Sequence, residues 1–469
     1  MRLISGKSWG SPTGTLQTVY MALVRATLAY GQELYDSSSK MSLSKLDTVQ
    51  SKALRLILRC PKSTSIAAME VLARVPPLKI VRQMAINNFW TKVRSMNGHP
   101  LTEEYNMPKL RLLNLPEEHK PMVQKYKEML EELELDKTAL VSNPQIPDFW
   151  TMIPPTLDLG LTDVIDKKTT NQEIQKSTAL SFIDERYKDH VKIYTDGSKT
   201  NGKSAAGVTS KELQIEETVR LDDEVSITTV ELFAIHMAIN SIHSNAELAS
   251  PERHNNLKVA ILTDSKSAIQ SLAGDPERAQ RGDLTRAILE KSTELIEKYK
   301  IPLSLVWIPA HCGIAGNEKA DSLAKAGTSQ AQNITIGLSP KEFKKLLGRA
   351  LFNKKWQSKW QSKKTQTVKY IPTIKCKVKK MPPKLTRLVL NRPYFCPYPE
   401  ANTPCQDCDR TNTVSHALLD CRNYDKERQL LAKSLNKPIL ALEDILHEDV
   451  LYKHKAAIMN FIDKIKLQI

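Results

Sequence analysis

The chain has 469 residues, of which 41% are hydrophobic and 26% charged, a composition typical of a globular protein with about two to four domains. Its formal net charge of +16 favours a polyanionic partner such as nucleic acid. No run of about 18 apolar residues occurs, which excludes a strongly apolar spanning helix, so we expect no membrane partner.

The cysteine content and the first residues indicate a reducing compartment. The chain has seven cysteines, an odd number, and a single C-x-x-C pair, which is not the pattern of a disulfide-rich secreted domain. No charged segment followed by an apolar segment opens the chain. We therefore expect an intracellular protein, cytoplasmic or nuclear, whose cysteines are free thiols or metal ligands.

Helical spacing of apolar residues characterises the first 96 residues. It predicts helices over 16–35, 43–59 and 80–96, separated by a run of serines and a pair of prolines. The segments YMALVRATLAYGQELY, LSKLDTVQSKALRLILR and PPLKIVRQMAINNFW resemble the thumb-side end of reverse transcriptases from non-LTR, or LINE-type, retrotransposons. The resemblance implies that this module is a remnant of a polymerase thumb.

A polymerase palm would need a pair of aspartates on a tight hairpin to hold magnesium. The only Asp-Asp pair in the chain is Asp222–Asp223, which lies in a polar connection after a predicted strand, with no aromatic residue before it. We therefore expect no polymerase active site in this chain.

The sequence pattern changes near residue 189. Residues 97–187 are rich in charge and proline, with one amphipathic helix near 121–136, and we interpret them as a linker or as a segment covering the next domain. Beyond them, short alternating or apolar runs predict five strands, at 191–195, 204–210, 215–221, 257–263 and 303–308. Helical spacing predicts helices at 228–245, 265–272, 284–299 and 316–326. This order predicts an α/β domain with a mixed five-stranded sheet flanked by helices.

Four acidic residues are each presented by a different predicted element of this domain. They are Asp196 on the first strand, Glu231 on the first helix, Asp264 after the fourth strand and Asp321 on the last helix. Mg²⁺ takes hard oxygen ligands, and two ions about 4 Å apart can hold both the attacking water and the leaving oxygen of a phosphodiester. Separate elements are needed to supply the ligands, because adjacent residues on one strand face opposite sides.

The sequence around these acids resembles a known family. The blocks TDGS, ELFAI, LTDSKSAI and WIPAHCGIAGNEKAD occur in the order of type 1 ribonuclease H domains, in the form carried by non-LTR retrotransposons. The resemblance covers residues 188–328 and implies a ribonuclease H-like fold. It implies hydrolysis of the RNA strand of RNA–DNA hybrids with two Mg²⁺ or Mn²⁺ ions, leaving 3′-hydroxyl and 5′-phosphate ends. The metal ligands would be Asp196, Glu231, Asp264 and Asp321, and His311 would be the loop histidine.

The residues around His311 agree with a role in catalysis. His311 lies in a loop that contains Gly313 and Gly316, where it is poorly placed to be a core residue. An imidazole changes charge near pH 7, which suits proton transfer or product release. The alternative is an ordinary surface histidine.

Recognition of a hybrid would need groups that read 2′-hydroxyls on one strand and phosphates on the other. Five polar residues beside the acids are candidates: Ser198, Lys199, Thr229, Ser265 and Lys266. Serine and threonine are also common at these places because they cap helices, and this is the alternative interpretation.

A strongly basic segment follows the predicted nuclease domain. Lys341–Arg387 holds 16 Lys or Arg residues and one acid, Glu342, a net charge of +15. Lysines contact phosphates and aromatic rings stack on unpaired bases, so Trp356 and Trp360 are candidate nucleic-acid contacts. The alternative is an amphipathic helix that packs on the nuclease domain and exposes its lysines to solvent.

The C-terminal region has the spacing of a zinc site. Cys405, Cys408, His416 and Cys421 form a C-x2-C-x7-H-x4-C pattern, and three thiolates with one imidazole can complete a tetrahedral shell. The segment CQDCDRTNTVSHALLDC resembles the zinc-knuckle-like motif downstream of the nuclease in the same elements. Cys396 is a substitute candidate, and reduced cysteines in a turn-rich region are the alternative.

The predicted organisation has five parts: a thumb-like helical module at 1–96, a spacer at 97–187, a ribonuclease H domain at 188–328, a basic linker at 329–390 and a zinc-binding helical region at 391–469. We expect an endoribonuclease that acts on RNA–DNA hybrids and takes no small-molecule substrate; the oligomeric state is left open. An alternative of another class is a catalytically inactive nucleic-acid-binding fragment of a decayed element. A DDE-type transposase would share the sheet, but an acid on the first helix and an aspartate on the last argue against it.

Overall fold

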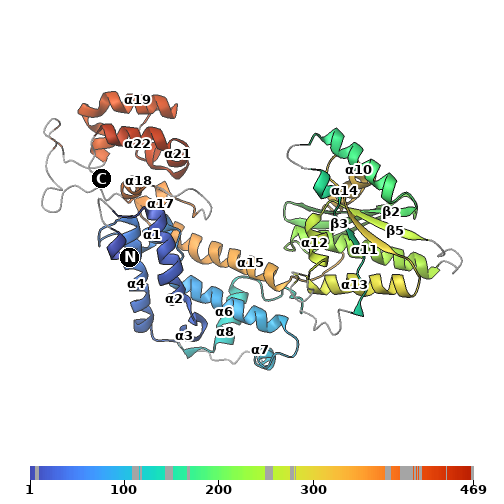
Figure 1. Cartoon of the computed structure of the whole chain (residues 1–469). Helices are drawn as coiled ribbons and strands as arrows, with labels where there is room; N and C mark the ends of the chain where they lie inside the picture. The colour runs from blue at the N-terminus through green and yellow to red at the C-terminus, as the bar shows by residue number, and fades with distance from the viewer. Residues whose placement is uncertain are drawn as a thin grey trace. The chain divides into compact units, whose positions relative to one another are not determined.

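The computed structural model of the chain describes residues 1–5, 10–107, 116, 119–142, 151–165, 170–248, 257–274, 279, 281–374, 382–390, 405, 408, 410, 415–439 and 441–465 (Figure 1). The chain divides into two compact units. The sheet unit comprises Asn88–Pro108 and Leu130–Leu347, and the helical unit comprises Met1–Asn87, Lys109–Met129 and Gly348–Ile469. Within the described ranges, every helix is too short or too polar to traverse a lipid bilayer.

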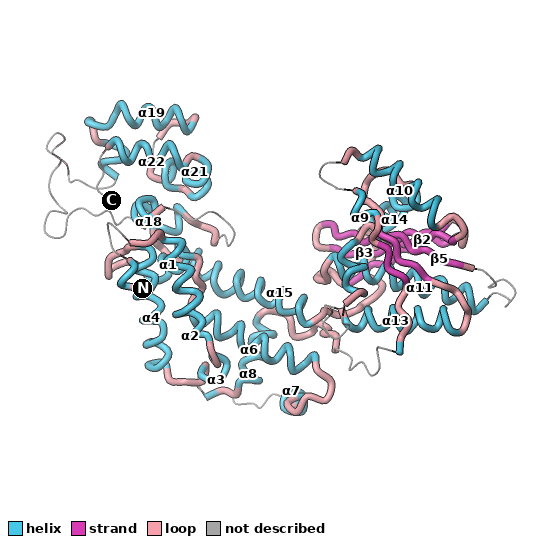
Figure 2. The backbone as a smooth tube through the Cα atoms, viewed as in Figure 1, coloured by secondary structure: helices cyan, strands magenta, loops and turns pink. Residues whose placement is uncertain are grey.

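The sheet unit is built on one sheet of six strands, drawn in magenta in Figure 2. The strands are β1 (Thr156–Asp158), β2 (His190–Thr200), β3 (Lys203–Ser210), β4 (Ile215–Leu221), β5 (Lys258–Thr263) and β6 (Leu303–Trp307). Their order is β1-β6-β5-β2-β3-β4. The β2, β3 and β4 strands form an antiparallel meander, whereas β1, β6, β5 and β2 pair in parallel. The predicted fold class, a mixed sheet flanked by helices, is confirmed.

The sheet has one strand more than the five that the sequence predicts. β1 pairs in parallel with β6, with Thr156 opposite Ser304 and Asp158 opposite Val306. Its three residues fall in the segment interpreted as a linker or cover. The prediction of five strands was wrong because a run as short as TLD has no readable alternation, and only its partner strand makes it a strand.

Among the residues that the structure describes, seven helices belong wholly to the sheet unit. They are α7 (Thr102–Asn106), α9 (Leu161–Val164), α10 (Gln172–Arg186), α11 (Ile227–Leu248), α12 (Lys266–Leu272), α13 (Gly282–Glu297) and α14 (Ala315–Gly327). In Figure 1, α11, α12 and α13 lie on one side of the sheet, and α10 and α14 lie on the other. The central strand β5 is buried from Val259 to Thr263, as expected where a sheet is covered on both faces.

A glycine allows α14 to pack tightly on β3. A Cβ at Gly207 would lie 2.5 Å from the Ala320 carbonyl oxygen and 2.7 Å from the Ala324 nitrogen, both backbone atoms of α14. Any larger residue would force the helix away from the strand. Because α14 also carries Asp321, this close approach sets the position of one of the predicted site residues.

The Asp-Asp pair has structural roles. The Asp222 carboxylate accepts hydrogen bonds from the backbone nitrogens of Ile336 (2.8 Å) and Gly337 (3.1 Å). Asp223 pairs with the buried Arg220 guanidinium. Both acids therefore fix the loop around the end of β4 and the connection that follows α14.

The helical unit contains the remaining helices, and α6, α8 and α15 have residues in both units. Toward the N-terminus they are η1 (Arg2–Ile4), α1 (Thr13–Val19), η2 (Tyr20–Arg25), α2 (Ala26–Ala29), α3 (Gln32–Tyr35), α4 (Lys40–Leu58), α5 (Ile66–Ala73), α6 (Leu78–Ser95) and α8 (Met122–Glu132). Toward the C-terminus they are α15 (Pro340–Leu351), η6 (Phe352–Gln357), α16 (Ser358–Gln361), α17 (Gln366–Tyr370), α18 (Pro383–Val389), η8 (His416–Asp420), η9 (Arg422–Tyr424), α19 (Asp425–Leu435), α20 (Glu443–Leu446), α21 (Glu448–Lys453) and α22 (Lys455–Lys464).

One hydrophobic core of the helical unit joins segments from both ends of the chain. Ala68 and Val71 of α5 pack in the same cluster as Leu388 of α18 and Phe461 of α22. The thumb-like residues and the C-terminal helices thus bury apolar surface against each other. We expect them to unfold together, because neither set can expose its apolar face without cost.

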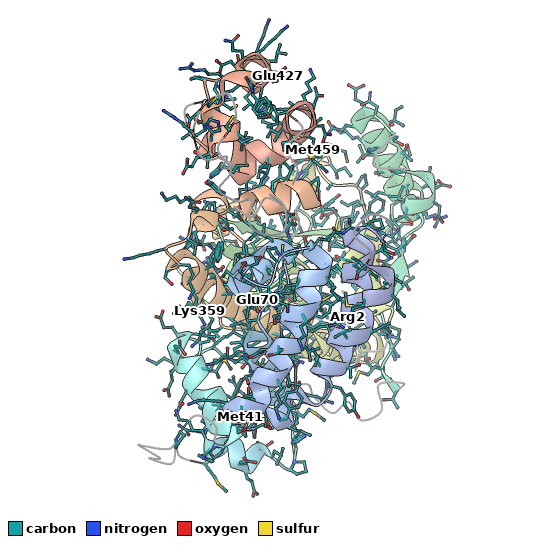
Figure 3. All side chains as sticks on the ribbon, turned by 90° about the vertical axis from the view of Figure 1, so that its left-hand side faces the viewer. Arg2, Met41, Glu70, Lys359, Glu427 and Met459 are labelled. Carbon is teal, nitrogen blue, oxygen red and sulfur yellow. The ribbon has the colours of Figure 1, made fainter. Side chains whose placement is uncertain are left out.

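A buried polar network lies inside the helical unit, around Glu70, which is labelled in Figure 3. Gln50 Nε2 donates to Glu70 Oε1 at 3.1 Å, and Tyr20 Oη and Arg25 both donate to Gln50 Oε1. Glu70 is only 9% exposed. Burial raises the pKa of Glu70 to about 7, although the hydrogen bond from Gln50 acts in the opposite direction. The carboxyl therefore titrates near neutral pH.

This titration predicts that the helical unit loses stability as the pH rises. The ordinary pKa of the group is 4.5, so between pH 4.5 and about 7 the folded unit retains a proton that the unfolded chain has released. Stability falls with increasing pH wherever the folded state binds more protons. Thermal unfolding should show a melting temperature several degrees lower at pH 8 than at pH 5, and Glu70→Gln should remove that part of the slope. An equal slope in both proteins would contradict the assignment.

Candidate active site and metal clusters

The pairing of β2 with β5 brings two of the predicted acids together. The parallel register runs from His190 opposite Lys258 to Thr195 opposite Thr263 and ends there. Asp196 and Asp264 are the next residues on each strand, so they leave the parallel ladder side by side. Ligands of α/β sheets bind at such carboxyl ends of strands. Asp264 is held further by the Trp307 indole nitrogen, which donates to its carbonyl oxygen at 3.0 Å.

The start of α11 brings Glu231 against the same strand. A Cβ at Gly197 would lie 3.0 Å from the backbone nitrogen of Glu231, a tight contact that would push the start of α11 slightly away from the strand. The Glu231 side chain is 7% exposed, and its Oε2 has no hydrogen-bond partner among the described residues. A buried carboxylate oxygen without a partner is costly, and such a group is expected to meet a ligand.

The last acid and the histidine come from α14 and the loop before it. Asp321 is buried, and Lys325, one turn later, donates to its Oδ2 at 2.6 Å. His311 Nδ1 lies 3.9 Å from the same oxygen. The histidine has a φ of 53° and a side chain that is 65% exposed, so a left-handed turn holds its ring out in solvent beside the acids.

The predicted acids form two adjoining clusters. Carboxylate oxygens of Asp196, Glu231 and Asp264 lie within 4.8 Å of one another, and so do ligand atoms of His311, Glu318 and Asp321. The charge of Asp321 helps to raise the pKa of Asp196, so the two clusters lie close enough to interact. The structure therefore brings together all five residues that the sequence predicts for catalysis.

Two residues of this site were not predicted from the sequence. Glu318 joins His311 and Asp321, and it also accepts from the Gly313 backbone nitrogen at 3.2 Å. Asn317 is 1% exposed and points its Nδ2 toward Asp264 Oδ2 at 3.5 Å. Both stand in the block GNEKAD, one helical turn or less before Asp321, and this spacing is the signal that could have found them.

Burial and then mutual repulsion raise the pKa of two of these acids, Asp196 and Glu231. Burial, followed by the charges of Asp264 and Asp321, raises the pKa of Asp196 to about 8. Burial, followed by Asp196, raises the pKa of Glu231 well above its ordinary value. A divalent cation would reverse this, because it stabilises the ionised form of each ligand. The oxygen-only donor set and the unpartnered Glu231 Oε2 fit Mg²⁺ or Mn²⁺.

A cluster of carboxylates at the ends of the central strands is a place where an α/β fold can hold a divalent metal ion. Residues 188–329 match the family model described as RNase H, so the chain contains an RNase H domain at these residues. One solved structure in the comparison is LC11-RNase H1, isolated from compost by a metagenomic approach. It is 15% identical, with a TM-score of 0.24, and the match covers 30% of this chain and 99% of that chain.

The predicted hybrid contacts differ in their surroundings. Ser198 and Ser265 are largely buried, and Ser265 Oγ accepts from the Ala268 nitrogen as the N-cap of α12. Lys199 Nζ donates to the carbonyl oxygens of Asp223 (2.7 Å) and Val225 (2.6 Å). The capping alternative thus describes Ser265, and Lys199 is tied to the loop before α11.

Of the other two predicted contacts, Thr229 is buried and Lys266 is exposed. Thr229 is 1% exposed and donates to Glu342 Oε1 at 2.6 Å, so its hydroxyl points into the protein. Lys266, at the start of α12, is exposed. Of the five predicted hybrid contacts, Lys199 and Lys266 are exposed, and the Lys199 ammonium group is hydrogen-bonded to two backbone carbonyl oxygens.

The two tryptophans of the basic segment are buried in the core of the helical unit. Trp356 is 6% exposed and Trp360 is 3% exposed, and the Trp360 indole nitrogen donates to the Ile371 carbonyl oxygen at 2.7 Å. Their rings pack with Leu385 and Leu388 of α18. This placement leaves no open ring face for an unpaired base and favours the alternative of a packed amphipathic helix. The helix packs into the core of the helical unit, however, and not on the nuclease domain as that alternative expected.

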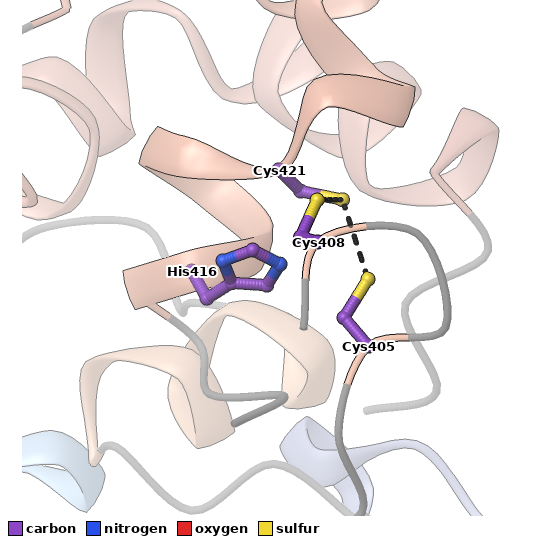
Figure 4. Close-up of side chains that lie close together, drawn as sticks. All are labelled: Cys405, Cys408, His416 and Cys421. Atoms are coloured by element: carbon purple, nitrogen blue, oxygen red, sulfur yellow. Dashed lines mark hydrogen bonds between the residues drawn. The ribbon is translucent and has the colours of Figure 1, made fainter. Parts of the chain in front are cut away.

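The four predicted zinc ligands converge in the helical unit, as Figure 4 shows. Ligand atoms of Cys405, Cys408, His416 and Cys421 all lie within 4.8 Å of one another. The Cys421 sulfur is 3.9 Å from the sulfurs of both Cys405 and Cys408. A zinc ion with Zn–S bonds of about 2.3 Å in tetrahedral geometry places its sulfurs about 3.8 Å apart, so the cluster fits this metal.

The electrostatics of the cysteine cluster agree with a cation site. Burial, followed by the neighbouring thiols Cys405 and Cys408, raises the pKa of Cys421 to about 11. Ionising three clustered thiols is unfavourable until a cation compensates their charge. Cys396, the substitute candidate, lies outside the described residues.

Proposed function

We propose that the RNase H domain hydrolyses the RNA strand of RNA–DNA hybrids as a metal-dependent endonuclease. The observation that carries the proposal is the convergence of Asp196, Glu231, Asp264 and Asp321 from four separate elements of a domain that matches the RNase H family. A set of buried acids held this close serves no packing purpose, because each raises the cost of ionising the others.

In the proposed reaction, the four acids hold two Mg²⁺ or Mn²⁺ ions. When bound there, such ions would lower the pKa of a water and neutralise charge on the departing 3′ oxygen. Asp196 would serve both clusters, because it is grouped with Glu231 and Asp264 and lies close enough to Asp321 for that charge to act on its pKa. The products would carry 3′-hydroxyl and 5′-phosphate ends.

His311 would move the proton in this reaction. Its ring is exposed on the rim of the acid clusters, within reach of a group bound there, and its Nδ1 lies 3.9 Å from Asp321 Oδ2. A nearby carboxylate can orient an imidazole ring. His311 can therefore deliver a proton to the leaving oxygen or assist product release.

We infer that the chain derives from a non-LTR retrotransposon. The inference is supported by the resemblance of residues 1–96 to a reverse-transcriptase thumb and by the cysteine–histidine motif downstream of the RNase H domain. In this setting the domain would remove the RNA template from a newly made hybrid.

The purified full chain tests the activity directly. It is incubated with a hybrid whose RNA strand is labelled, and with the same sequence as double-stranded RNA, double-stranded DNA and single-stranded RNA. We expect internal cleavage of the hybrid RNA alone, with Mg²⁺ or Mn²⁺ present, and none in a chelator. Binding of the hybrid without any metal-dependent product would overturn the proposal and favour the inactive binding fragment.

We also propose that Cys405, Cys408, His416 and Cys421 hold one structural zinc ion. Elemental analysis of the purified chain should give one zinc per molecule, and the Cys405→Ser, Cys408→Ser double variant should lose it. The C-terminal helices should then exchange their amide hydrogens faster, since metal binding is coupled to local folding. Cys60→Ser, whose thiol lies outside the cluster, is the matched control and should keep the ion. Retention of one zinc in the double variant would refute the ligand set.

A further inference from the structure

A lysine from outside the RNase H family match lies beside the active-site loop. Lys176 belongs to α10, and the family match begins at residue 188. A Cβ at Gly313 would lie 3.3 Å from Lys176 Nζ, and Gly313 follows His311 by two residues. The Lys176 charge also acts on Cys312: burial raises the pKa of that thiol, and the lysine opposes the rise.

The position of Lys176 is fixed by the packing of its helix. Gln175, Ala179 and Ile183 form the buried face of α10. At the end of the helix, Tyr187 Oη donates to Asp158 Oδ2 at 2.7 Å, and Asp158 belongs to β1, the added edge strand of the sheet. The segment interpreted from the sequence as a spacer is therefore attached to the RNase H domain. The turn of α10 that carries Lys176 lies beside the loop that contains His311 and Gly313.

Lys176 is an available cation at a strongly acidic site. Its side chain is exposed, and among the described residues no hydrogen bond or ion pair engages its ammonium group. Two other lysines near the acids are engaged: Lys325 pairs with Asp321, and Lys199 donates to backbone carbonyl oxygens. A nucleic acid that approaches a site with several carboxylates needs positive charge on its rim, because its own phosphates are repelled.

We propose that Lys176 binds a backbone phosphate of the RNA–DNA hybrid next to His311, so that α10 forms part of the substrate-binding rim. This inference rests on the proposed hybrid-cleaving function. An ammonium group on a flexible stem suits a phosphate contact that adds affinity without reading sequence. The contact would belong to the added β1–α10 extension and not to the matched domain.

Steady-state cleavage by the full chain tests the proposal. Lys176→Ala should raise the KM for the hybrid about five-fold and leave kcat at saturating hybrid within about two-fold, because the contact is made equally in the ground and transition states. The slope of log KM against log salt should fall by about one, the signature of one lost phosphate contact. Lys176→Arg should retain most of the wild-type KM. Lys188→Ala, which removes an exposed lysine just beyond the other end of α10, should change none of these values.

The outcomes separate this inference from the proposed function. Absence of hybrid cleavage by the wild-type chain would remove the proposed function and the inference with it. Cleavage by the wild type with an unchanged KM and salt slope in Lys176→Ala would overturn the inference alone. If Lys176→Ala lowers the melting temperature and kcat but leaves KM unchanged, Lys176 stabilises the loop and does not bind the hybrid. That result would also overturn the inference.

Discussion

Asp264→Asn should lower the rate of hybrid cleavage by at least about 10³-fold, which corresponds to about 4 kcal/mol of transition-state stabilisation. The amide keeps the size of the side chain and an oxygen toward Asn317 Nδ2, so the local structure should be retained. It removes the negative charge that a divalent cation requires from its ligand set. Hybrid binding should survive within a few-fold, because the cations and hydroxyls that face the substrate are untouched.

The same change at a remote acid controls for charge alone. Asp189 is exposed and precedes β2, at the opposite end of that strand from Asp196. Asp189→Asn should leave the cleavage rate within about two-fold and the melting temperature unchanged. Cleavage at the wild-type rate by Asp264→Asn would remove this residue from the site, and loss of binding in parallel with activity would show that the variant is misfolded.

Glu342→Ala should destabilise the sheet unit by about 3–5 kcal/mol, the cost of breaking a buried charged network. Glu342 is 5% exposed and accepts hydrogen bonds from the Ser226 nitrogen (2.6 Å), the Thr229 hydroxyl (2.6 Å) and the Ser339 nitrogen (2.9 Å). The Arg281 guanidinium lies 3.9 Å away. Truncation leaves these buried donors without an acceptor, which is the costly case. Urea denaturation followed by hydrogen exchange of α11 and β5 amides measures the loss.

An exposed glutamate provides the comparison for this variant. Glu297→Ala on α13 should change the stability by no more than about 0.5 kcal/mol. Burial alone would raise the pKa of Glu342, but the hydrogen bonds to Thr229, Ser226 and Ser339 hold it below its ordinary value. This depressed pKa means that the contribution is complete at neutral pH and is lost as the pH falls through the carboxyl range. A Glu342→Ala protein as stable as Glu297→Ala would show that the network adds nothing.

Glu342 also links the basic segment to the catalytic domain. It lies in the first turn of α15, and its partners Ser226 and Thr229 stand at the start of α11, two residues or more before Glu231. The sequence shows it only as the single acid in a segment of 16 basic residues. Its tertiary contacts explain why one acid is present there.

The acids could be predicted from the sequence because each stands in a local block whose residues also shape its element. TDGS supplies both Asp196 and the glycine that lets α11 approach, and LTDSKSAI supplies Asp264 together with the N-cap Ser265. The strands that carry these blocks are apolar enough to be recognised as buried. Local pattern and chemistry coincide at this site, so sequence spacing was sufficient.

The misplaced expectations concern residues whose neighbours are distant in the chain. Trp356 and Trp360 look like nucleic-acid contacts among so many lysines, but α18 and α5 supply an apolar core for their rings. The sequence suggests Thr229 as a substrate contact, but in the structure its hydroxyl donates a hydrogen bond to Glu342, which is distant in the chain. Whether an aromatic or a hydroxyl group is open to a ligand depends on such partners, and composition does not reveal them.

The sequence by itself determined the α/β class, and it picked out the acids, the histidine and the cysteine–histidine set that the structure brings into clusters, because helical and strand periodicities and motif spacings are local properties. Only the tertiary structure decided that β1 adds a sixth strand, that Glu318 and Asn317 join the site, and that Lys176 reaches the loop of His311. These depend on which segments pack together. That choice follows from burial and pairing between residues distant in the chain, for which no local pattern exists.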